Sequence, residues 1–335
     1  MKRLVPVLLI LLLFSSHDMF LKLDQYLLEP NAKTTIALYN GTYELSDNVI
    51  TRDRMQEVSV VANGQRTRID SSEWYEKDKT TYLNLTTGEA GTYVVGVSTK
   101  ARDFGQSAES FNGYLEHDGV LDMLEQRKQN GTLGDSAVER YSKHVKTIFQ
   151  VGDERTDNYK TQLGYPIEFV LLDNPYDMHP GHALRVKLLF NQQPLANQLV
   201  YLGREGSGHT HTHDGSTHSH DEDGGHNHDD LIQLRTNVNG RLKVPISSEG
   251  IYYLKTIHLV ENNEEGLTHE SNWATVTFAI ADGGHDHDHG HSDDHGHSHD
   301  HDHDHDEGIP TYIWVIISIL LIAILYLLFD RKKKD

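Results

Sequence analysis

The 335-residue chain contains no cysteine. This excludes disulfide bonds, thiolate metal ligands, a cysteine nucleophile and an acylated N-terminal cysteine, so any metal ligand must be a nitrogen or oxygen atom. Basic residues are also scarce, because 30 Lys and Arg stand against 50 Asp and Glu, which gives a net charge of −20 with histidine neutral. That balance argues against nucleic acid as a partner and favours cations.

Catalytic signatures are missing as well. The sequence has no HExxH zinc-protease motif, no GxSxG nucleophile motif and no phosphate-binding loop. We therefore predict that the protein is not an enzyme, and we assign no catalytic residue and no organic cofactor.

Residues 282–307 have no apolar side chain to bury, and histidine alternates with aspartate through most of them. Such a segment cannot offset the entropy cost of ordering, so we expect it to be disordered. A second tract of the same character lies at residues 209–228. The predicted metal ligands in the two tracts are His209, His211, His213, His218, His220, His226 and His228, followed by His285, His287, His289, His291, His295, His297, His299, His301, His303 and His305.

Imidazole nitrogens and carboxylate oxygens are ligands that nickel, cobalt, zinc and copper accept. On an extended chain, alternate side chains leave on the same side about 7 Å apart, so a modest bend brings two ring nitrogens to one ion. The tracts therefore predict a bound transition-metal ion (Ni, Co, Zn or Cu) without identifying it. The alternative is a solvated acidic spacer whose histidines only titrate.

Two apolar runs predict export and anchoring. Residues 1–16 join a short basic start to an apolar run and resemble a signal peptide, with an uncleaved anchor as the alternative. Residues 309–329 carry no charge and, as a helix, are long enough to span a bilayer. The basic tail 330–335 follows, which the positive-inside rule puts in the cytoplasm. We predict a single-pass protein of the cytoplasmic (inner) membrane, with its body in the periplasm or outside the cell.

Short alternating segments separated by turn residues predict a mainly β fold. We expect an Ig-like sandwich at 17–110 and a prealbumin-like sandwich at 156–281, which the His-rich loop 204–230 interrupts. Helical spacing at 121–125 and 138–146 predicts a helical bridge at 111–155, with His117 and His144 on its surface. The predicted strands are 34–39, 58–61, 81–85, 91–97, 167–172, 183–190, 198–202, 242–246, 250–260 and 273–280.

Several short motifs, in their order and spacing, resemble a bacterial family. They are His17–Phe20, Leu28–Pro30, Glu139–Lys143, Gln150–Gly152, Leu163–Glu168, Asn174–Tyr176, Pro180–Gly181, Gln193–Ala196, Thr236–Gly240 and Glu270–Thr275. Together they are similar to the NikM-like periplasmic family of nickel/cobalt uptake, an uncharacterised two-part β-sandwich domain. The resemblance covers residues 17–280. It implies that the protein takes part in transition-metal import together with a metal permease complex. The second sandwich also resembles prealbumin-like and carboxypeptidase-regulatory-like modules, which bind or support rather than catalyse.

His17 and Asp18 are the predicted metal ligands outside the tracts. If a signal peptide is cut after Ser16, the free α-amino group of His17 lies within chelating distance of its own ring, and Asp18 could add a ligand. A nitrogen-rich set of this kind suits Ni²⁺ or Cu²⁺. The alternative is a cut elsewhere, because Phe14 fits a cleavage site poorly. The next candidates are His179, His182, His258 and His269.

The sequence thus predicts a membrane-anchored extracytoplasmic protein that captures nickel, cobalt or zinc for an uptake system. The tail before the spanning segment would have a reach of about 30 Å as a flexible chain and could deliver metal to a permease. Two alternatives stay open, namely a sequestration or resistance protein that buffers zinc or copper, and a structural β-sandwich surface protein.

Metal loading should depend on pH between about 7.5 and 5. A free imidazole has a pKa of about 6.5, and the proton competes with the metal for the same lone pair. Neighbouring aspartates favour the protonated ring and should move metal release to somewhat higher pH. Calorimetric titration of the full chain with Ni²⁺ at several pH values measures this. An affinity that stays constant over the whole range would contradict imidazole ligation.

Overall fold

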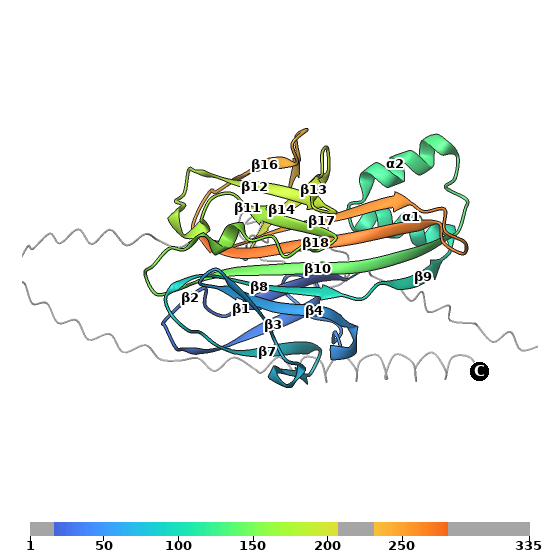
Figure 1. Ribbon diagram of the computed structural model, residues 1–335. Helices are drawn as coiled ribbons and strands as arrows, with labels where there is room; N and C mark the ends of the chain where they lie inside the picture. The colour runs from blue at the N-terminus through green and yellow to red at the C-terminus, as the bar shows by residue number, and fades with distance from the viewer. Residues whose placement is uncertain (1–16, 207–230, 281–335) are drawn as a thin grey trace, which may run out of the picture. The chain divides into compact units, whose positions relative to one another are not determined.

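The computed structural model describes residues 17–206 and 231–280. Within them the chain is mainly β, arranged as three sheets with two α-helices at one end (Figure 1). The predicted signal peptide, most of the His-rich loop, the acidic tail and the predicted spanning segment 309–329 lie outside the described residues. In the part of the chain that is described, no helix has the length and apolar character needed to cross a membrane.

A ten-stranded sheet forms the middle of the molecule. Its strands in order are β15 (Ile232–Arg235), β14 (Leu199–Arg204), β17 (Gly250–Glu261), β18 (His269–Ile280), β10 (Ala137–Val151), β8 (Gly91–Thr99), β4 (Met55–Ala62) and β5 (Gln65–Arg68), while β2 (Leu27–Leu28) and β9 (Arg102–Gln106) also pair with β10. Strands β10 and β18 are parallel neighbours, whereas β10 and β8 run antiparallel. Strand β10 therefore joins segments that we predicted to belong to two separate sandwiches.

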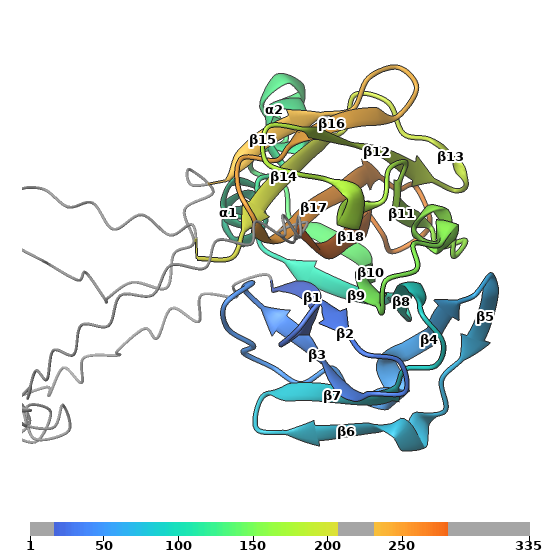
Figure 2. The same ribbon diagram turned by 90° about the vertical axis from the view of Figure 1, so that its left-hand side faces the viewer.

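Two four-stranded sheets flank the middle one, as Figure 2 shows. One contains β1 (Asp18–Leu23), β3 (Lys33–Gly41), β7 (Thr80–Thr86) and β6 (Trp74–Lys77), and the other contains β11 (Ile167–Leu171), β12 (Ala183–Phe190), β13 (Gln193–Pro194) and β16 (Arg241–Pro245). Strands β10 and β18 lie between them and are buried along most of their length. Such strands lose the alternation of apolar and polar residues that marks a half-buried strand.

Hydroxyl groups fasten β1 to the middle sheet. Thr275 Oγ1 donates to the carbonyl oxygen of Met19 at 2.7 Å, and Thr277 Oγ1 donates to that of Leu21 at 2.6 Å. Because the numbers rise together along both strands, β1 runs in the same direction as β18. This register places His17, which precedes β1, near the level of Trp273.

The two α-helices are α1 (Ala108–His117) and α2 (Leu121–Asn130). Helix α1 begins after Ser107, whose Oγ accepts the backbone N–H of Ser110, an N-cap worth about 1 kcal/mol. Helix α2 ends where Gly131 adopts a φ of 71°, a left-handed conformation that favours glycine. Short 3₁₀ turns lie at η1 (Arg52–Arg54), η2 (Ser71–Glu73), η3 (Asp157–Lys160) and η4 (Pro175–Asp177).

The prediction of a helix at 138–146 is wrong, because these residues belong to strand β10. Glu139, Lys143 and Lys146 recur at three- and four-residue intervals and so imitate the polar face of a helix. In the structure all three side chains are buried. The helical bridge predicted at 111–155 is therefore limited to α1 and α2, and the helical spacing at 121–125 is confirmed by α2. Every strand predicted above overlaps an observed strand.

Lys146 on β10 and Glu168 on β11 form a buried ion pair. Glu168 also accepts the backbone N–H groups of Leu163 and Gly164, each at 2.9 Å. Replacing Glu168 by glutamine would leave the Lys146 ammonium buried without a counter-charge. We expect Glu168→Gln to lower the free energy of unfolding by about 3–5 kcal/mol, measured by urea denaturation of the full chain.

The matched control is Asp157→Asn, which removes the carboxylate of the exposed pair with Lys160. Solvent screens that pair, so its loss should change the unfolding midpoint little. Similar small effects of both substitutions would contradict the role assigned to Glu168.

Candidate functional site

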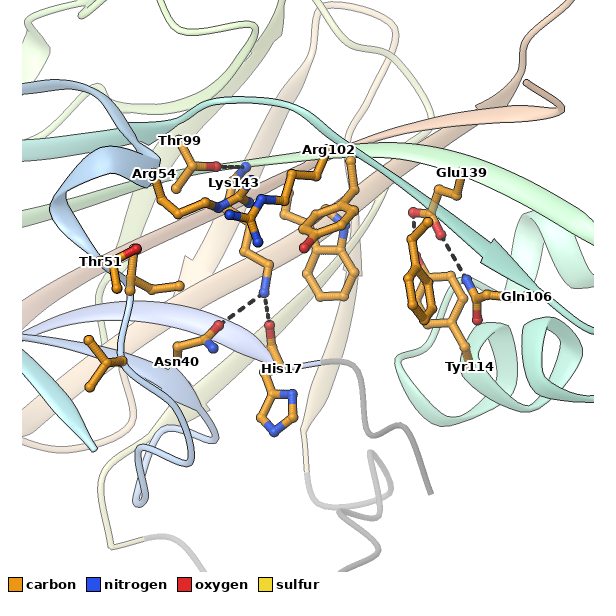
Figure 3. Close-up of a pocket in the computed structure, with 15 residues that line it drawn as sticks. His17, Asn40, Thr51, Arg54, Thr99, Arg102, Gln106, Tyr114, Glu139 and Lys143 are labelled. Atoms are coloured by element: carbon orange, nitrogen blue, oxygen red, sulfur yellow. Dashed lines mark hydrogen bonds between the residues drawn. The ribbon is translucent and has the colours of Figure 1, made fainter. Parts of the chain in front are cut away.

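A cavity of about 510 Å³ opens beside His17, the first described residue (Figure 3). Its walls come from the residue before β1, the end of β3, the η1 turn and the segment before it, the end of β8, strands β9 and β10, helix α1, and Trp273 on β18. Ligand pockets in proteins usually measure about 300–1,000 Å³, so the cavity has the size of a small-molecule site. No single stretch of sequence contributes more than a few of its residues, and sequence analysis did not predict it.

Lys143 lies in the wall of the cavity and is 7% exposed. Its ammonium group donates to the carbonyl oxygen of His17 and to Asn40 Oδ1, and it lies 4.9 Å from the ring centroid of Trp273. Trp273 is the residue directly opposite Lys143 on β18, which explains why the two side chains meet. Burial lowers the pKa of Lys143 to about 8, so the ammonium form still predominates at pH 7.

Arg54 and Arg102 bring two guanidinium groups to the same cavity. Arg54 closes the η1 turn, is 8% exposed and lies over the ring of Tyr141 at 5.6 Å from the guanidinium carbon to the centroid. Arg102 begins β9 directly opposite Tyr141 on β10 and is exposed. In Figure 3 the two arginine side chains extend toward Lys143 from opposite sides.

Glu139 supplies the carboxyl group of the cavity wall. Ser271 Oγ and the Tyr114 hydroxyl donate to its Oε1, the latter at 3.3 Å, and Gln106 Nε2 donates to Oε2 at 3.2 Å. Burial raises the pKa of Glu139 to about 7. At neutral pH this carboxyl group is therefore only partly ionised and balances little of the positive charge around it.

His17 lies at the edge of the cavity with its ring partly exposed. Its Nε2 is 3.4 Å from Asp47 Oδ2 and 3.3 Å from Asn48 Nδ2. Burial, and then the nearby Lys143 ammonium, lower the pKa of His17 below its ordinary value. The ring is therefore neutral at pH 7 and keeps a nitrogen lone pair, which is the form that binds a metal ion.

The other residue predicted beside it, Asp18, faces a different partner. Its Oδ2 accepts from Lys255 Nζ at 2.5 Å in a largely buried ion pair. Asp47 rather than Asp18 is the carboxylate next to the His17 ring. No sequence signal identified Asp47, because it follows β3 in an irregular segment.

The remaining candidate histidines lie apart from His17. The rings of His179 and His182 are 5.7 Å apart, His258 Nδ1 is 2.8 Å from Gln198 Oε1, and His269 Nδ1 is 2.7 Å from Thr268 Oγ1. Across residues 17–206 and 231–280, no three side chains of the metal-binding types come together. The seventeen histidines predicted in the two tracts lie outside the described residues.

His144 was predicted to lie on a surface, and the structure corrects this. It is 2% exposed, with Ser98 Oγ at 2.9 Å from Nδ1 and Ser142 Oγ at 3.0 Å from Nε2. Burial lowers its pKa to about 4, so the ring is neutral at pH 7. The error follows from the wrong helix, since a strand inside the middle sheet has no solvent face here.

Glu139 should make stability fall as the pH rises toward neutrality. Its pKa in the folded protein, about 7, lies above its ordinary value of 4.5, so the stabilisation is complete below pH 4.5 and is lost as the pH rises through 7. Glutamine cannot ionise. The free energy of unfolding of Glu139→Gln, relative to the unsubstituted chain, should therefore increase by about 2 kcal/mol between pH 5 and pH 8.

Urea denaturation at the two pH values measures this difference, and other titrating groups cancel because both proteins carry them. The control is Glu109→Gln, which changes an exposed carboxylate on α1. This variant controls for the replacement of a carboxylate by an amide at an exposed position, and the increase for Glu139→Gln should exceed any change that it shows. A difference for Glu139→Gln that stays constant would mean that the buried carboxyl group does not titrate in this range.

The chain matches one protein family and is distantly similar to several solved structures. Solved structures that match include Salmonella alpha-2-macroglobulin reacted with methylamine (12% identity, TM-score 0.21, 78% of this chain and 15% of that one) and the D0-D1 domain of intimin (11%, 0.18, 77% and 96%). The Yersinia pseudotuberculosis adhesin InvE also matches (12%, 0.19, 77% and 58%). The chain thus spans less than two thirds of the first and third of these proteins. A comparison with curated proteins gave no match. The model of the domain of unknown function DUF4198 matches residues 14–260, and the chain therefore belongs to the DUF4198 family.

Proposed function

We propose that this protein is a membrane-anchored, extracytoplasmic metal-binding protein that captures nickel, cobalt or zinc ions for an uptake system. The observation that carries the proposal is the pair of histidine-rich tracts, with seven histidines at 209–228 and ten at 282–307. Neutral imidazoles interleaved with carboxylates bind these ions, and repeated overlapping sites give capacity rather than one rigid site. The NikM-like resemblance supports nickel or cobalt over the other metals.

The attachment points of the tracts on the folded body support a shared role. Residue Glu205, just before the loop tract, donates its backbone N–H to the carbonyl oxygen of Ile251 at 2.8 Å. Ile251 pairs in turn with Ala279, one residue before the described chain ends ahead of the tail tract. Only β17 separates the two attachment points, so they lie about 10 Å apart on strand spacing. The two tracts are therefore attached close to each other on the folded body.

His17 lies at the level of Trp273, about seven residues before β18 ends at Ile280. At the rise of an extended strand, this separation from the attachment points is about 23 Å. The reach of about 30 Å expected for the tail exceeds that separation. A tail that collects ions could thus exchange them with a site at His17. The neutral ring, the Asp47 carboxylate at 3.4 Å and, after cleavage at Ser16, the α-amino group would form that site.

Replacing residues 209–228 and 283–306 by Gly/Ser segments of equal length should remove most metal sites from the full chain. Calorimetric titration with Ni²⁺, Co²⁺ and Zn²⁺ at neutral pH measures the number and affinity of the sites. Any tight Ni²⁺ site left after the replacement should disappear with His17→Ala. If the unsubstituted chain binds none of the three ions, the proposal is wrong.

His258→Ala is the matched control, because this histidine bonds to Gln198 away from His17 and should leave the remaining Ni²⁺ site intact. Cells that carry the tract replacement should also take up nickel more slowly when the metal is limiting. Normal uptake together with lost binding would favour sequestration over delivery.

A further inference from the structure

Positive charge gathers around the His17 cavity although the chain as a whole is strongly acidic. Lys143, Arg54 and Arg102 all line the cavity, whereas Glu139 is the acidic residue in its wall. Burial is the main cause that lowers the pKa of Lys143 and of Arg54. Arg54 adds to the lowering at Lys143, and Arg102 adds to it at Arg54, so neighbouring cations disfavour one another's charge. Like charges held together in a partly desolvated space are costly unless an anion joins them.

Within the described residues no carboxylate bonds to these three cations, although Asp18 and Asp118 favour the Lys143 ammonium through space. Lys143 donates to two neutral oxygens, from His17 and Asn40. Across residues 17–206 and 231–280, neither Arg54 nor Arg102 forms an ion pair or a side-chain hydrogen bond, and Asp53 acts on both only through space. Arg54 is more than nine-tenths buried and faces the cavity.

Glu139 does not neutralise the charge of these three cations. Its two oxygens are taken by Ser271, Tyr114 and Gln106, and its carboxyl group is only partly ionised at neutral pH. Figure 3 shows it on the far side of the cavity from the arginines. Elsewhere in the same strand Lys146 has a carboxylate partner, Glu168, so the absence of one at Lys143 is a local feature.

Aromatic rings form much of the remaining wall. Tyr114 and Trp273 stack on each other with centroids 6.0 Å apart and planes 9° apart, and Tyr141 lies beneath Arg54. Flat apolar walls next to guanidinium groups suit a ligand with a flat or slender carbon body and carboxylate ends, because guanidinium binds carboxylate through two parallel hydrogen bonds.

We propose that this cavity is a binding site for a small organic carboxylate. Arg54, Arg102 and Lys143 bind its carboxylate groups, and the aromatic wall holds its carbon body. The site is distinct in chemistry from the metal-binding tracts, and it does not depend on the function proposed above.

The test uses the full chain, freed of metal by a chelator that is then removed by dialysis. Phthalate, succinate and inorganic sulfate are titrated separately by calorimetry at low ionic strength. Phthalate or succinate should bind with an affinity at least about tenfold above that of sulfate. Sulfate can pair with the cationic side chains, but it has no carbon body to pack against the aromatic wall. No binding of either carboxylate, or sulfate binding as tight as theirs, overturns the proposal.

Arg102→Gln is the informative variant, because Arg102 is exposed and its loss should not disturb folding. It should weaken carboxylate binding by about tenfold or more through loss of a charge-assisted hydrogen bond. Arg241→Gln removes the same charge from an exposed position on β16 and should leave binding unchanged. Equal weakening by both variants would mean general electrostatic attraction and would overturn the site. Because the protein is metal-free, either failure leaves the metal-binding proposal standing.

Discussion

Burial of strand β10 on both faces is the constraint on which the rest of the structure depends. The strand pairs with β8 and β18 along its edges, and the two outer sheets cover it. Yet it carries Glu139, Lys143 and Lys146 in its buried length. A charge without a partner in such a place costs several kcal/mol, so the surrounding elements must supply polar groups at three defined positions.

The three buried ionisable groups are compensated in different ways. This difference distinguishes groups that stabilise the fold from a group that is available for binding. Lys146 has a carboxylate partner, Glu168, which also accepts two backbone N–H groups, and this makes a closed network. Glu139 accepts three hydrogen bonds from uncharged groups and is partly neutral. Lys143 has only neutral acceptors and faces a cavity beside two arginines. A protein that needed only a stable core would gain little from leaving this third charge open.

Local patterns predicted most strands, but they failed where tertiary contacts outweigh them. Strands such as β12 carry a regular alternation with turns at both ends, and this information is in the sequence itself. In β10 the spacing of the charged residues suggested a helix, because sequence alone does not reveal that each charge is buried. Most of helix α1 lies inside the predicted helical bridge, but no helical spacing was identified there, since its apolar residues pack on β18 without a long periodic run.

The candidate site could be predicted only in part for a related reason. His17 was identified from its place behind a signal-like segment and from the family resemblance. Arg54, Arg102 and Lys143 come from three separate elements, and only the strand pairing of β9 with β10 and the turn before β4 brings them together.

The resulting division of charge has a physical consequence. The acidic tracts join the body at one end of β18, about 23 Å from the cation-lined cavity on strand rise, and the Debye length at physiological ionic strength is about 8 Å. Screening therefore largely uncouples the cavity from the charges at the attachment points, even though the net charge of the chain is −20.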